Sequence, residues 1–155
     1  MSGFISNSEK ETKDFAFDLA KKLKGSDILA IYGNLGAGKT TFIQGLAAGL
    51  GYLGRVFSPT FVIIRPYKIT GTNRTTTTKQ KNPKIKTLYH VDLYRIEEET
   101  DLKTLGIEEF LNDKGAICAI EWPEKIEKYL SENTIKIRFE TLGENDRKIT
   151  ISGLT

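Results

Sequence analysis

The spacing of apolar residues predicts where this chain forms helices and where it forms strands. Near the N-terminus, apolar side chains recur at three- and four-residue intervals, at Ala16, Leu19, Ala20 and Leu23. This spacing predicts an amphipathic helix. A serine followed three residues later by a glutamate, in both residues 6–9 and 8–11, fits a capping box at its start, and Gly25 suits its end.

Residues 28–32 form a short apolar run that is too short for a helix and typical of a buried strand. After a glycine-rich segment, helical spacing resumes over residues 41–50, at Phe42, Ile43, Leu46, Ala47 and Leu50. Gly49 and Gly51 are placed to end this second helix. The sequence therefore predicts a strand, a glycine loop and a helix in direct succession.

Three further apolar runs predict strands at residues 61–67, 87–93 and 116–120. Pro66 lacks a backbone N–H donor, so it indicates the end or the edge of a strand. Between the last two strands, Asp101 is placed to cap a short helix through Leu105, and residues 107–111 present one apolar face. Pro123 predicts the first turn of another helix, which runs to about residue 130.

The C-terminal segment alternates strictly. Apolar Ile135, Ile137 and Phe139 are interleaved with charged residues, a turn covers residues 142–146, and residues 148–152 alternate back. This pattern predicts an antiparallel hairpin with one buried face. Together with the preceding strands and helices, it predicts one three-layer α/β domain over residues 1–155, with a mixed, mostly parallel sheet.

Residues 68–86 interrupt the periodic pattern. The segment is rich in threonine and holds six basic residues and no acidic residue, the basic ones being Lys68, Arg74, Lys79, Lys81, Lys84 and Lys86. It predicts an exposed loop between two strands. A solvated insertion is the simpler interpretation, and a basic flap that touches RNA phosphates or an acidic partner is the alternative.

Composition narrows the class of protein. With 155 residues, the chain can bury a core without disulfide or metal staples. Its net charge of +3 is too small to indicate nucleic-acid binding by itself. One cysteine excludes an internal disulfide, and one cysteine with one histidine argues against a zinc site. No apolar run is long enough to span a bilayer, and we expect a cytoplasmic protein.

The glycine-rich segment carries the clearest chemistry. Residues 33–40, Gly-Asn-Leu-Gly-Ala-Gly-Lys-Thr, fit the P-loop pattern G-x-x-x-x-G-K-[ST] between a strand and a helix. Glycines let the backbone turn its N–H groups toward a ligand, and a helix N-terminus adds partial positive charge. We expect Lys39 to reach the β- and γ-phosphates of a nucleoside triphosphate and the Thr40 hydroxyl to bind Mg²⁺.

Hydrolysis also needs an acid near the metal and a group that positions water. Ligands of open α/β sheets bind at the carboxyl ends of strands. Two acids follow predicted strands, Asp92 after residues 88–91 and Glu121 after residues 116–120. Each could hold Mg²⁺ directly, hold it through water, orient the attacking water, or simply cap the next element. The sequence does not decide which of these roles each of the two acids has.

Neighbouring residues allow weaker inferences. His90 shares a strand face with Asp92, so it could hydrogen-bond that carboxylate or a phosphate, or be a structural histidine. Cys118 is interpreted as packing; Trp122 is either packing or a contact surface. Residues 58–60, Ser-Pro-Thr, lie where P-loop switch proteins sense the γ-phosphate, although a proline turn is the simpler interpretation.

Four motifs in this order resemble the TsaE (YjeE) family: residues 33–42, residues 58–61, residues 90–95 (His-Val-Asp-Leu-Tyr-Arg) and residues 121–124 (Glu-Trp-Pro-Glu). The resemblance covers nearly the whole chain. It implies a P-loop NTPase fold and a bacterial cytoplasmic ATPase required for N6-threonylcarbamoyladenosine at position 37 of tRNAs that read ANN codons. It also implies binding to a TsaB–TsaD complex, which ATP hydrolysis resets between turnovers, and leaves direct contact with tRNA open.

The resemblance implies roles for single residues. The Mg²⁺ positions of the family match Thr40 and Glu121, its acid near the phosphates matches Asp92, and its switch-like segment matches Thr60. The expected catalytic residues are Lys39, Thr60, Asp92 and Glu121. Looser matches add Thr12 near adenine and Arg147, so the expected nucleotide contacts are Thr12, Asn34, Gly36, Ala37, Gly38, Lys39, Thr40, Thr41, Asp92 and Arg147. Residues 71–83 depart from the family by their length and threonine content.

Two other functions share a P-loop. A small-molecule kinase would need an acceptor pocket and an arginine-bearing lid, whereas the lid-sized insertion at residues 68–86 has one arginine, Arg74. A GTP-binding switch would need an Asn-Lys-x-Asp motif, which the sequence lacks. We therefore expect an enzyme that uses ATP and Mg²⁺, and that is slow alone because no arginine finger is evident.

Overall fold

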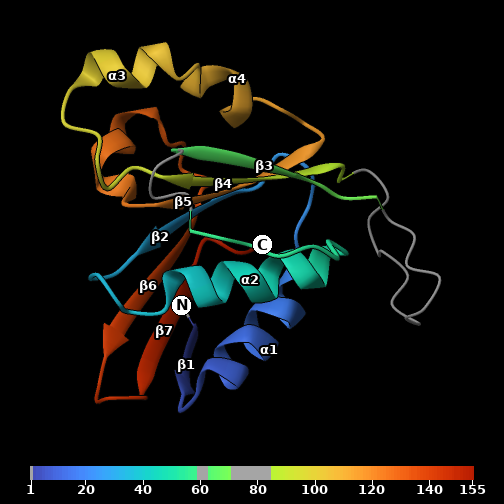
Figure 1. The fold of residues 1–155 in the computed structure, drawn as a ribbon, viewed down its shortest axis with the longest axis vertical. Coiled ribbons are helices and arrows are strands. Elements are labelled where there is room, and N and C mark those ends of the chain that lie inside the picture. The colour runs from blue at the N-terminus through green and yellow to red at the C-terminus, as the bar shows by residue number, and fades with distance from the viewer. Residues whose placement is uncertain (1, 59–62, 71–84) are drawn as a thin grey trace.

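The fold is built on one sheet, seen in a computed structural model that describes residues 2–58, 63–70 and 85–155 (Figure 1). Over these residues, seven strands pair in the order β1-β7-β6-β2-β5-β4-β3. Their bounds are β1 Ser2–Ser6, β2 Ile28–Tyr32, β3 Ile64–Lys68, β4 Thr87–Asp92, β5 Ala116–Glu121, β6 Ile135–Thr141 and β7 Arg147–Ser152. The predictions for β2, β4 and β5 are confirmed to within one residue at each end.

Parallel pairing holds the centre of the sheet and antiparallel pairing its edges. Strand β2 is parallel to β5 and β6, and β4 is parallel to β5. Strand β3 is antiparallel to β4, β7 to β6, and β1 to β7. The predicted C-terminal hairpin is therefore present as β6 and β7. Pro66 lies in the edge strand β3, where a missing N–H donor is tolerated.

Helices cover both faces of the sheet, which confirms the predicted three layers (Figure 1). One face carries α1 (Glu9–Ala20) and α2 (Lys39–Leu50), and the other carries α3 (Glu99–Thr104), α4 (Ile107–Leu111) and the 3-10 helix η1 (Pro123–Tyr129). Each face buries its own apolar cluster. In the described part of the chain, no helix has both the length and the apolar character that a bilayer crossing needs.

Strand β5 separates the two apolar clusters. Ile117 packs in the cluster beneath α1 and α2, and the next residue, Cys118, packs in the cluster with α4. The thiol donates to the backbone oxygen of Phe110 at 3.2 Å, and burial raises its pKa to about 12. Cys118 is therefore packing, as predicted, because the reactive thiolate is suppressed at neutral pH.

The start of α1 uses the capping box of residues 8–11. The Oγ atom of Ser8 accepts the Glu11 N–H at 3.1 Å, and the Glu11 carboxylate accepts the Asn7 N–H at 2.8 Å. The helix ends at Ala20 rather than at Gly25, with Lys21 as its C-cap. The apolar side chain of Leu23 stays buried beyond the helix, so helical spacing extends past the helix itself.

Two other boundaries differ from the prediction. Asp101 lies inside α3, which begins at Glu99 and has Glu98 as its N-cap, three residues before the predicted cap. Gly49 lies inside α2, and Gly51 alone ends that helix with a left-handed φ of 98°. The helix predicted to begin at Pro123 is present over Pro123–Tyr129 as a 3-10 helix, with a non-helical Ile126 inside it.

Strand β1 was not predicted, because five residues containing two serines and a glycine carry little strand signal. It forms by pairing antiparallel with β7, from Ser2 opposite Ile151 to Ser6 opposite Arg147. Phe4 packs against the core and stacks on Phe15 of α1, with ring centres 4.4 Å apart. Tertiary pairing therefore supplies the order that local propensity lacks.

The predicted exposed loop at residues 68–86 lies mostly outside the described residues, which omit 71–84. Its two described ends belong to the sheet. Lys68 is the last residue of β3, the Ile69 N–H donates to the Lys86 oxygen at 2.8 Å, and Ile69 and Ile85 are buried. The sequence-based boundaries were therefore too wide at both ends.

Helices α1 and α2 approach each other backbone to backbone. A Cβ atom added at Gly45 would collide with the backbone of Lys13, and one at Gly49 would lie 2.5 Å from the Phe17 oxygen. Glycine at these two positions lets α2 settle close against α1. Since α2 begins at the P-loop, this contact also fixes where the P-loop lies.

We predict that Gly45→Ala lowers the free energy of unfolding by about 1–3 kcal/mol, because overpacking outweighs the roughly 1 kcal/mol that alanine gains in a helix. Urea denaturation measures the change. Gly3→Ala is the control, since a Cβ there has no neighbour closer than 4.0 Å. A Gly45→Ala protein as stable as the Gly3→Ala protein would contradict the backbone contact.

Candidate functional site

The P-loop leaves α2 with an open N-terminus. Gly36 and Gly38 adopt left-handed φ angles of 77° and 100°, which a side chain would strain. Between them, the Ala37 N–H donates to the Asn34 oxygen at 3.0 Å and closes a turn. Gly38 is the N-cap of α2 and has no side chain to cap it. The first-turn N–H groups of α2 therefore lack a side-chain acceptor, as an anion site requires.

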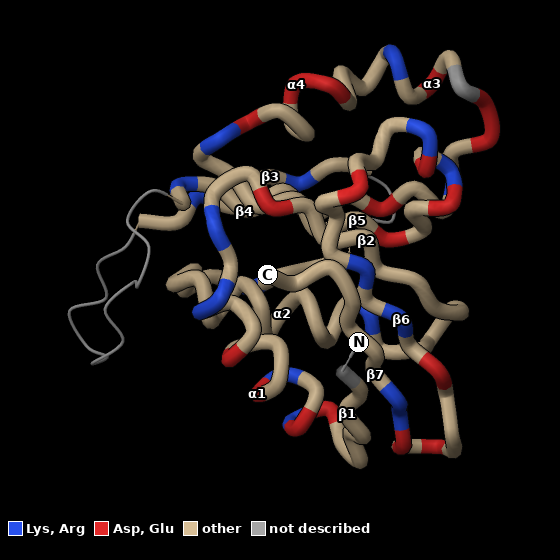
Figure 2. Tube along the Cα trace, turned by 180° about the vertical axis from the view of Figure 1, so that it is seen from behind, with Lys and Arg blue, Asp and Glu red and all other residues tan. Residues whose placement is uncertain are grey.

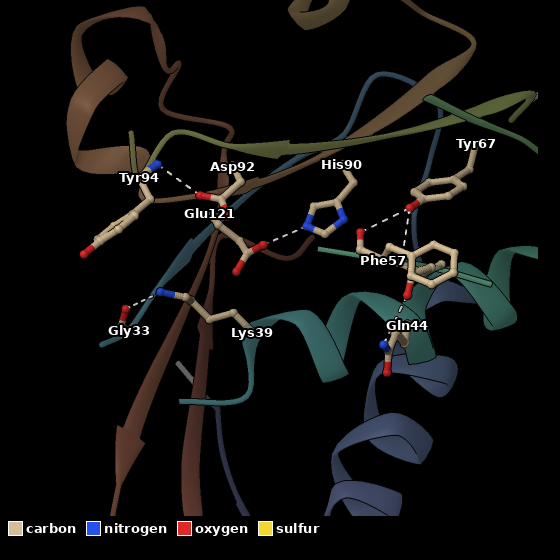
Figure 3. Close-up of polar contacts among 10 residues, drawn as sticks. Gly33, Lys39, Gln44, Phe57, Tyr67, His90, Asp92, Tyr94 and Glu121 are labelled. Atoms are coloured by element: carbon tan, nitrogen blue, oxygen red, sulfur yellow. Dashed lines mark hydrogen bonds and ion pairs between the residues drawn. The ribbon is translucent and has the colours of Figure 1, made fainter. Parts of the chain in front are cut away.

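Lys39 is the first residue of α2 and is almost wholly buried, with 5% of its surface exposed. Its Nζ atom donates to the Gly33 oxygen (Figure 3). The same atom lies 4.0 Å from the centre of the Trp122 ring. Burial lowers the Lys39 pKa, while Glu121 and Asp92 act in the opposite direction. The ammonium is thus held at the P-loop by a carbonyl, a ring face and nearby carboxylates.

Strands β4 and β5 bring the two predicted acids together. They are parallel neighbours, and Asp92 and Glu121, their last residues, are paired in register. Burial is the main cause that raises the Asp92 pKa, and the bond from the Tyr94 N–H to Asp92 Oδ1, 3.0 Å long, opposes it. Asp92 therefore also caps the following turn, which was the simpler interpretation of the sequence.

His90 contacts Glu121 rather than Asp92. Its Nε2 atom lies 2.7 Å from Glu121 Oε2, and the two side chains are 0% and 5% exposed (Figure 3). The sequence suggested Asp92 because residues two apart share a strand face. The register of β4 against β5 decides otherwise, because it places the Glu121 carboxylate beside the imidazole on the adjacent strand.

One cavity of about 530 Å³ gathers these elements. Its lining comes from the α1 start, the P-loop and the first turn of α2, the segment before β3, the ends of β4 and β5, the β6–β7 turn and the start of β7. The lining residues are Ser8, Glu9, Thr12, Leu35, Gly36, Ala37, Gly38, Lys39, Thr40, Thr41, Ser58, Asp92, Tyr94, Glu121, Trp122, Glu144, Asn145 and Arg147. All the predicted nucleotide contacts except Asn34 are in this lining. Asn34 contributes the carbonyl of the P-loop turn, and Thr60 lies outside the described residues.

Several lining residues escaped the sequence-based prediction. Tyr94 belongs to the motif of residues 90–95, which could have pointed to it. Glu144 and Asn145 lie in the hairpin turn, more than 100 residues from the P-loop, and no local signal connects them. Trp122 is half-buried and lies over Lys39, so it is a site residue rather than core packing alone.

Arg147 ties the hairpin turn to the P-loop. Its Nε atom donates to the Ala37 oxygen at 3.0 Å, and a terminal nitrogen donates to the Gly36 oxygen at 3.4 Å. The other terminal nitrogen donates to the backbone oxygens of Gly143 and Asp146, each at 3.0 Å. The guanidinium therefore lines the cavity while its donors are occupied by carbonyl groups.

Thr12 lines the cavity from α1. It is buried in α1, and its hydroxyl is 2.7 Å from the hydroxyl of Ser6, the last residue of β1. The unpredicted strand β1 thus contacts the residue that the family resemblance matches to a position near adenine.

Residues 56–58 are held against α2 and β3. The Gln44 amide donates to the Val56 oxygen at 3.2 Å. The Tyr67 hydroxyl accepts the Phe57 N–H at 3.1 Å and donates to the Phe57 oxygen at 3.3 Å (Figure 3). These contacts bring Ser58 to the cavity, at the start of the segment that the sequence compared with a switch.

The side chains present fit a magnesium–triphosphate group. The Thr40 hydroxyl and the Asp92 and Glu121 carboxylates supply the oxygen ligands that Mg²⁺ prefers. The glycine loop and Lys39 supply N–H donors for phosphate oxygens. A volume near 530 Å³ is of the size that small-molecule sites have.

Comparisons with known proteins agree on one family. Residues 6–149 match the family model described as threonylcarbamoyl adenosine biosynthesis protein TsaE. A Bacillus subtilis protein named tRNA threonylcarbamoyladenosine biosynthesis protein TsaE is 37% identical over 145 residues, which are 94% of this chain and 81% of that protein. A Treponema pallidum protein of the same name is 32% identical over 148 residues, which are 96% of this chain and 98% of that protein.

A solved structure gives the same answer for the fold. The crystal structure of Bacillus subtilis YdiB matches with a TM-score of 0.74 and 30% sequence identity, over 99% of this chain and 86% of that chain. The family model and the relatives each cover most of this chain. The chain therefore belongs to the TsaE family.

Proposed function

We propose that this chain is a cytoplasmic, Mg²⁺-dependent ATPase required for N6-threonylcarbamoyladenosine in tRNA. The pathway is inferred from the names that its relatives carry. The observation that supports ATPase activity is the convergence, in one cavity, of an uncapped helix N-terminus, a buried lysine and two strand-end carboxylates. We further propose that hydrolysis resets a TsaB–TsaD complex, as the family resemblance implies.

Different residues of the cavity would bind the phosphates and the Mg²⁺ ion. N–H groups of the P-loop and of the first turn of α2 receive the phosphate oxygens, and Lys39 exchanges its bond to the Gly33 oxygen for one to a phosphate. Mg²⁺, when bound, neutralises charge that develops on the phosphates. Thr40 and Glu121 would hold it, and Asp92 would hold or orient water beside it.

The base end of the cavity lies at α1. Thr12 lines it beside Ser8 and Glu9, while Arg147 closes the hairpin side. We propose adenine as the base on the strength of the family resemblance. Competition of ATP against GTP for the site tests this choice.

The same geometry favours slow hydrolysis by the isolated chain. Within the described residues that line the cavity, Arg147 is the one arginine, and its donors are taken by backbone carbonyls. An arginine that stabilises transition-state charge can raise phosphoryl transfer by about 10³–10⁵-fold. We propose that the partner complex completes the site. Leu35 and Tyr94, which are 75% and 47% exposed beside the cavity, support a protein contact there.

Lys39→Ala should weaken Mg·ATP binding by about 10- to 100-fold, because a charge-assisted hydrogen bond contributes roughly 1.5–3 kcal/mol. Isothermal titration calorimetry measures the affinity. Lys136→Ala, which removes an exposed lysine from β6, should bind as the wild type does. Equal affinities of the two variants would exclude Lys39 from the phosphate site.

Glu121→Gln should lower Mg²⁺-dependent kcat by about 100-fold or more, because an interaction with the reacting centre is lost while its shape is kept. Phosphate release, assayed with the partner complex and without it, gives kcat. Glu132→Gln on the exposed surface is the control. Intact turnover by Glu121→Gln would remove this carboxylate from the reaction.

The pathway is tested in cells. Depletion of the protein from its host should reduce threonylcarbamoyladenosine in digested tRNA, measured by mass spectrometry. Re-expressed wild-type chain should restore the modification, whereas Lys39→Ala should not. Normal modification in depleted cells would reject the pathway and leave the ATP site to be judged by calorimetry.

A further inference from the structure

The site contains a buried histidine that the proposed chemistry leaves unexplained. His90 is the only histidine in the sequence, and its side chain is fully buried in β4. It is not among the described residues that line the cavity, so it is not placed to touch a nucleotide. Its polar contact is with Glu121, one of the expected Mg²⁺ ligands.

The direction of this hydrogen bond follows from the chemistry of its two ends. A carboxylate oxygen only accepts, so Nε2 of His90 carries the proton that Glu121 Oε2 receives at 2.7 Å. The second nitrogen, Nδ1, is buried and finds no partner among the described residues. Figure 3 shows the ring between β4 and α2, with its Nε2 side turned to Glu121.

Such an arrangement is costly if it serves packing alone. An unsatisfied buried polar atom costs about 1–3 kcal/mol, and the fully buried Leu88, two residues away on the same face of β4, shows that this face accepts an apolar side chain. The polar contact that His90 makes in return is the one with Glu121. By occupying Oε2, the imidazole fixes the carboxylate rotamer and leaves the other oxygen on the side that faces Lys39 (Figure 3).

We propose that His90 is a positioning residue for the metal site: it holds Glu121 by Oε2 so that Oε1 alone is presented to Mg²⁺ or to its bound water. This inference rests on the proposed function, because it assigns a purpose to a residue behind the proposed metal ligand. Groups that orient a metal ligand from behind typically change metal affinity by about 10- to 100-fold when they are lost.

The side chain that replaces His90 decides the outcome. A glutamine amide nitrogen reaches about as far from the backbone as Nε2, whereas an asparagine amide nitrogen reaches only as far as Nδ1. His90→Gln should therefore keep a donor to Glu121, and His90→Asn should lose it. Both are uncharged amides of similar polarity, so their difference isolates the position of the donor.

The first measurement is the Mg²⁺ concentration that half-saturates ATP binding. Binding is monitored through the fluorescence of Trp122, which is the only tryptophan and lines the cavity. His90→Asn should raise this concentration about 10- to 100-fold, and His90→Gln should restore most of it. ATP binding in the presence of a chelator should be the same in both variants, because His90 does not reach the nucleotide.

Tyr89→Phe is the matched structural control. Tyr89 is the preceding residue of β4 and points to the other face, where its hydroxyl donates to Asp113 at 3.2 Å. This variant also removes one side-chain hydrogen bond from β4, so it should destabilise the fold without moving the Mg²⁺ midpoint. A shift as large as that of His90→Asn would show that the effect is structural and would overturn the assignment.

The second measurement needs neither metal nor activity. Because the chain has a single histidine, long-range ¹H–¹⁵N NMR spectra of the labelled full-length protein report its two ring nitrogens without ambiguity. We expect one protonated nitrogen, Nε2, whose signal shifts in Glu121→Gln. An Nδ1–H tautomer, or a spectrum indifferent to Glu121→Gln, would overturn the proposal.

The positioning role of His90 and the proposed ATPase activity can be rejected separately. If the wild-type chain binds ATP with a Mg²⁺ dependence that His90→Asn leaves unchanged, the positioning role is wrong and the proposed ATPase stands. If the wild type binds no Mg·ATP at all, both are wrong.

Discussion

The site depends on a helix that begins without a cap. Gly38 offers no side chain to the first turn of α2, and the left-handed turns at Gly36 and Gly38 direct the preceding backbone around the same space. Unpaired helix N–H groups cost free energy unless water or a ligand meets them. This open end can be held in place only because the rest of α2 is fixed elsewhere, by its backbone contact with α1 at Gly45 and Gly49 and by its C-cap at Gly51.

The second constraint is the negative charge of two neighbouring carboxylates at a partly buried position. Parallel pairing of β4 with β5 sets Asp92 beside Glu121, and like charges side by side oppose folding unless cations or hydrogen bonds offset them. Lys39 supplies a positive charge, His90 donates to Glu121, and the Tyr94 N–H donates to Asp92. Such a balance suits a site that receives a dication together with an anionic ligand, because both signs of charge are already anchored.

Segments that are far apart in the sequence form the walls of the cavity. Figure 2 shows the charged residues along the Cα trace, with acidic positions in the β6–β7 turn and basic positions on the strands that lead to it. Arg147 joins this turn to the P-loop by donating to carbonyl groups of both. Strand β1 then pairs with β7 and brings Ser6 to Thr12. The N-terminal and C-terminal strands therefore shape a cavity whose chemistry lies in the middle of the chain.

The sequence by itself determined the features that local spacing encodes. Apolar runs marked β2, β4 and β5 to within a residue, alternation marked the hairpin, and the glycine–lysine pattern marked the loop at the start of α2, because each signal lies within about ten neighbouring residues. The acids at the ends of β4 and β5 followed from the same reasoning, since parallel strands end at a common edge.

Only the tertiary structure decided the contacts that cross strand boundaries. The partner of His90, the carbonyl groups that occupy Arg147 and the pairing of β1 depend on strand order and register, which no local pattern in a single chain records. The residue pairs concerned are 31, 110 and more than 140 positions apart. Periodicity specifies which face of an element is buried, but the neighbour that covers that face is selected by the packing of the whole domain.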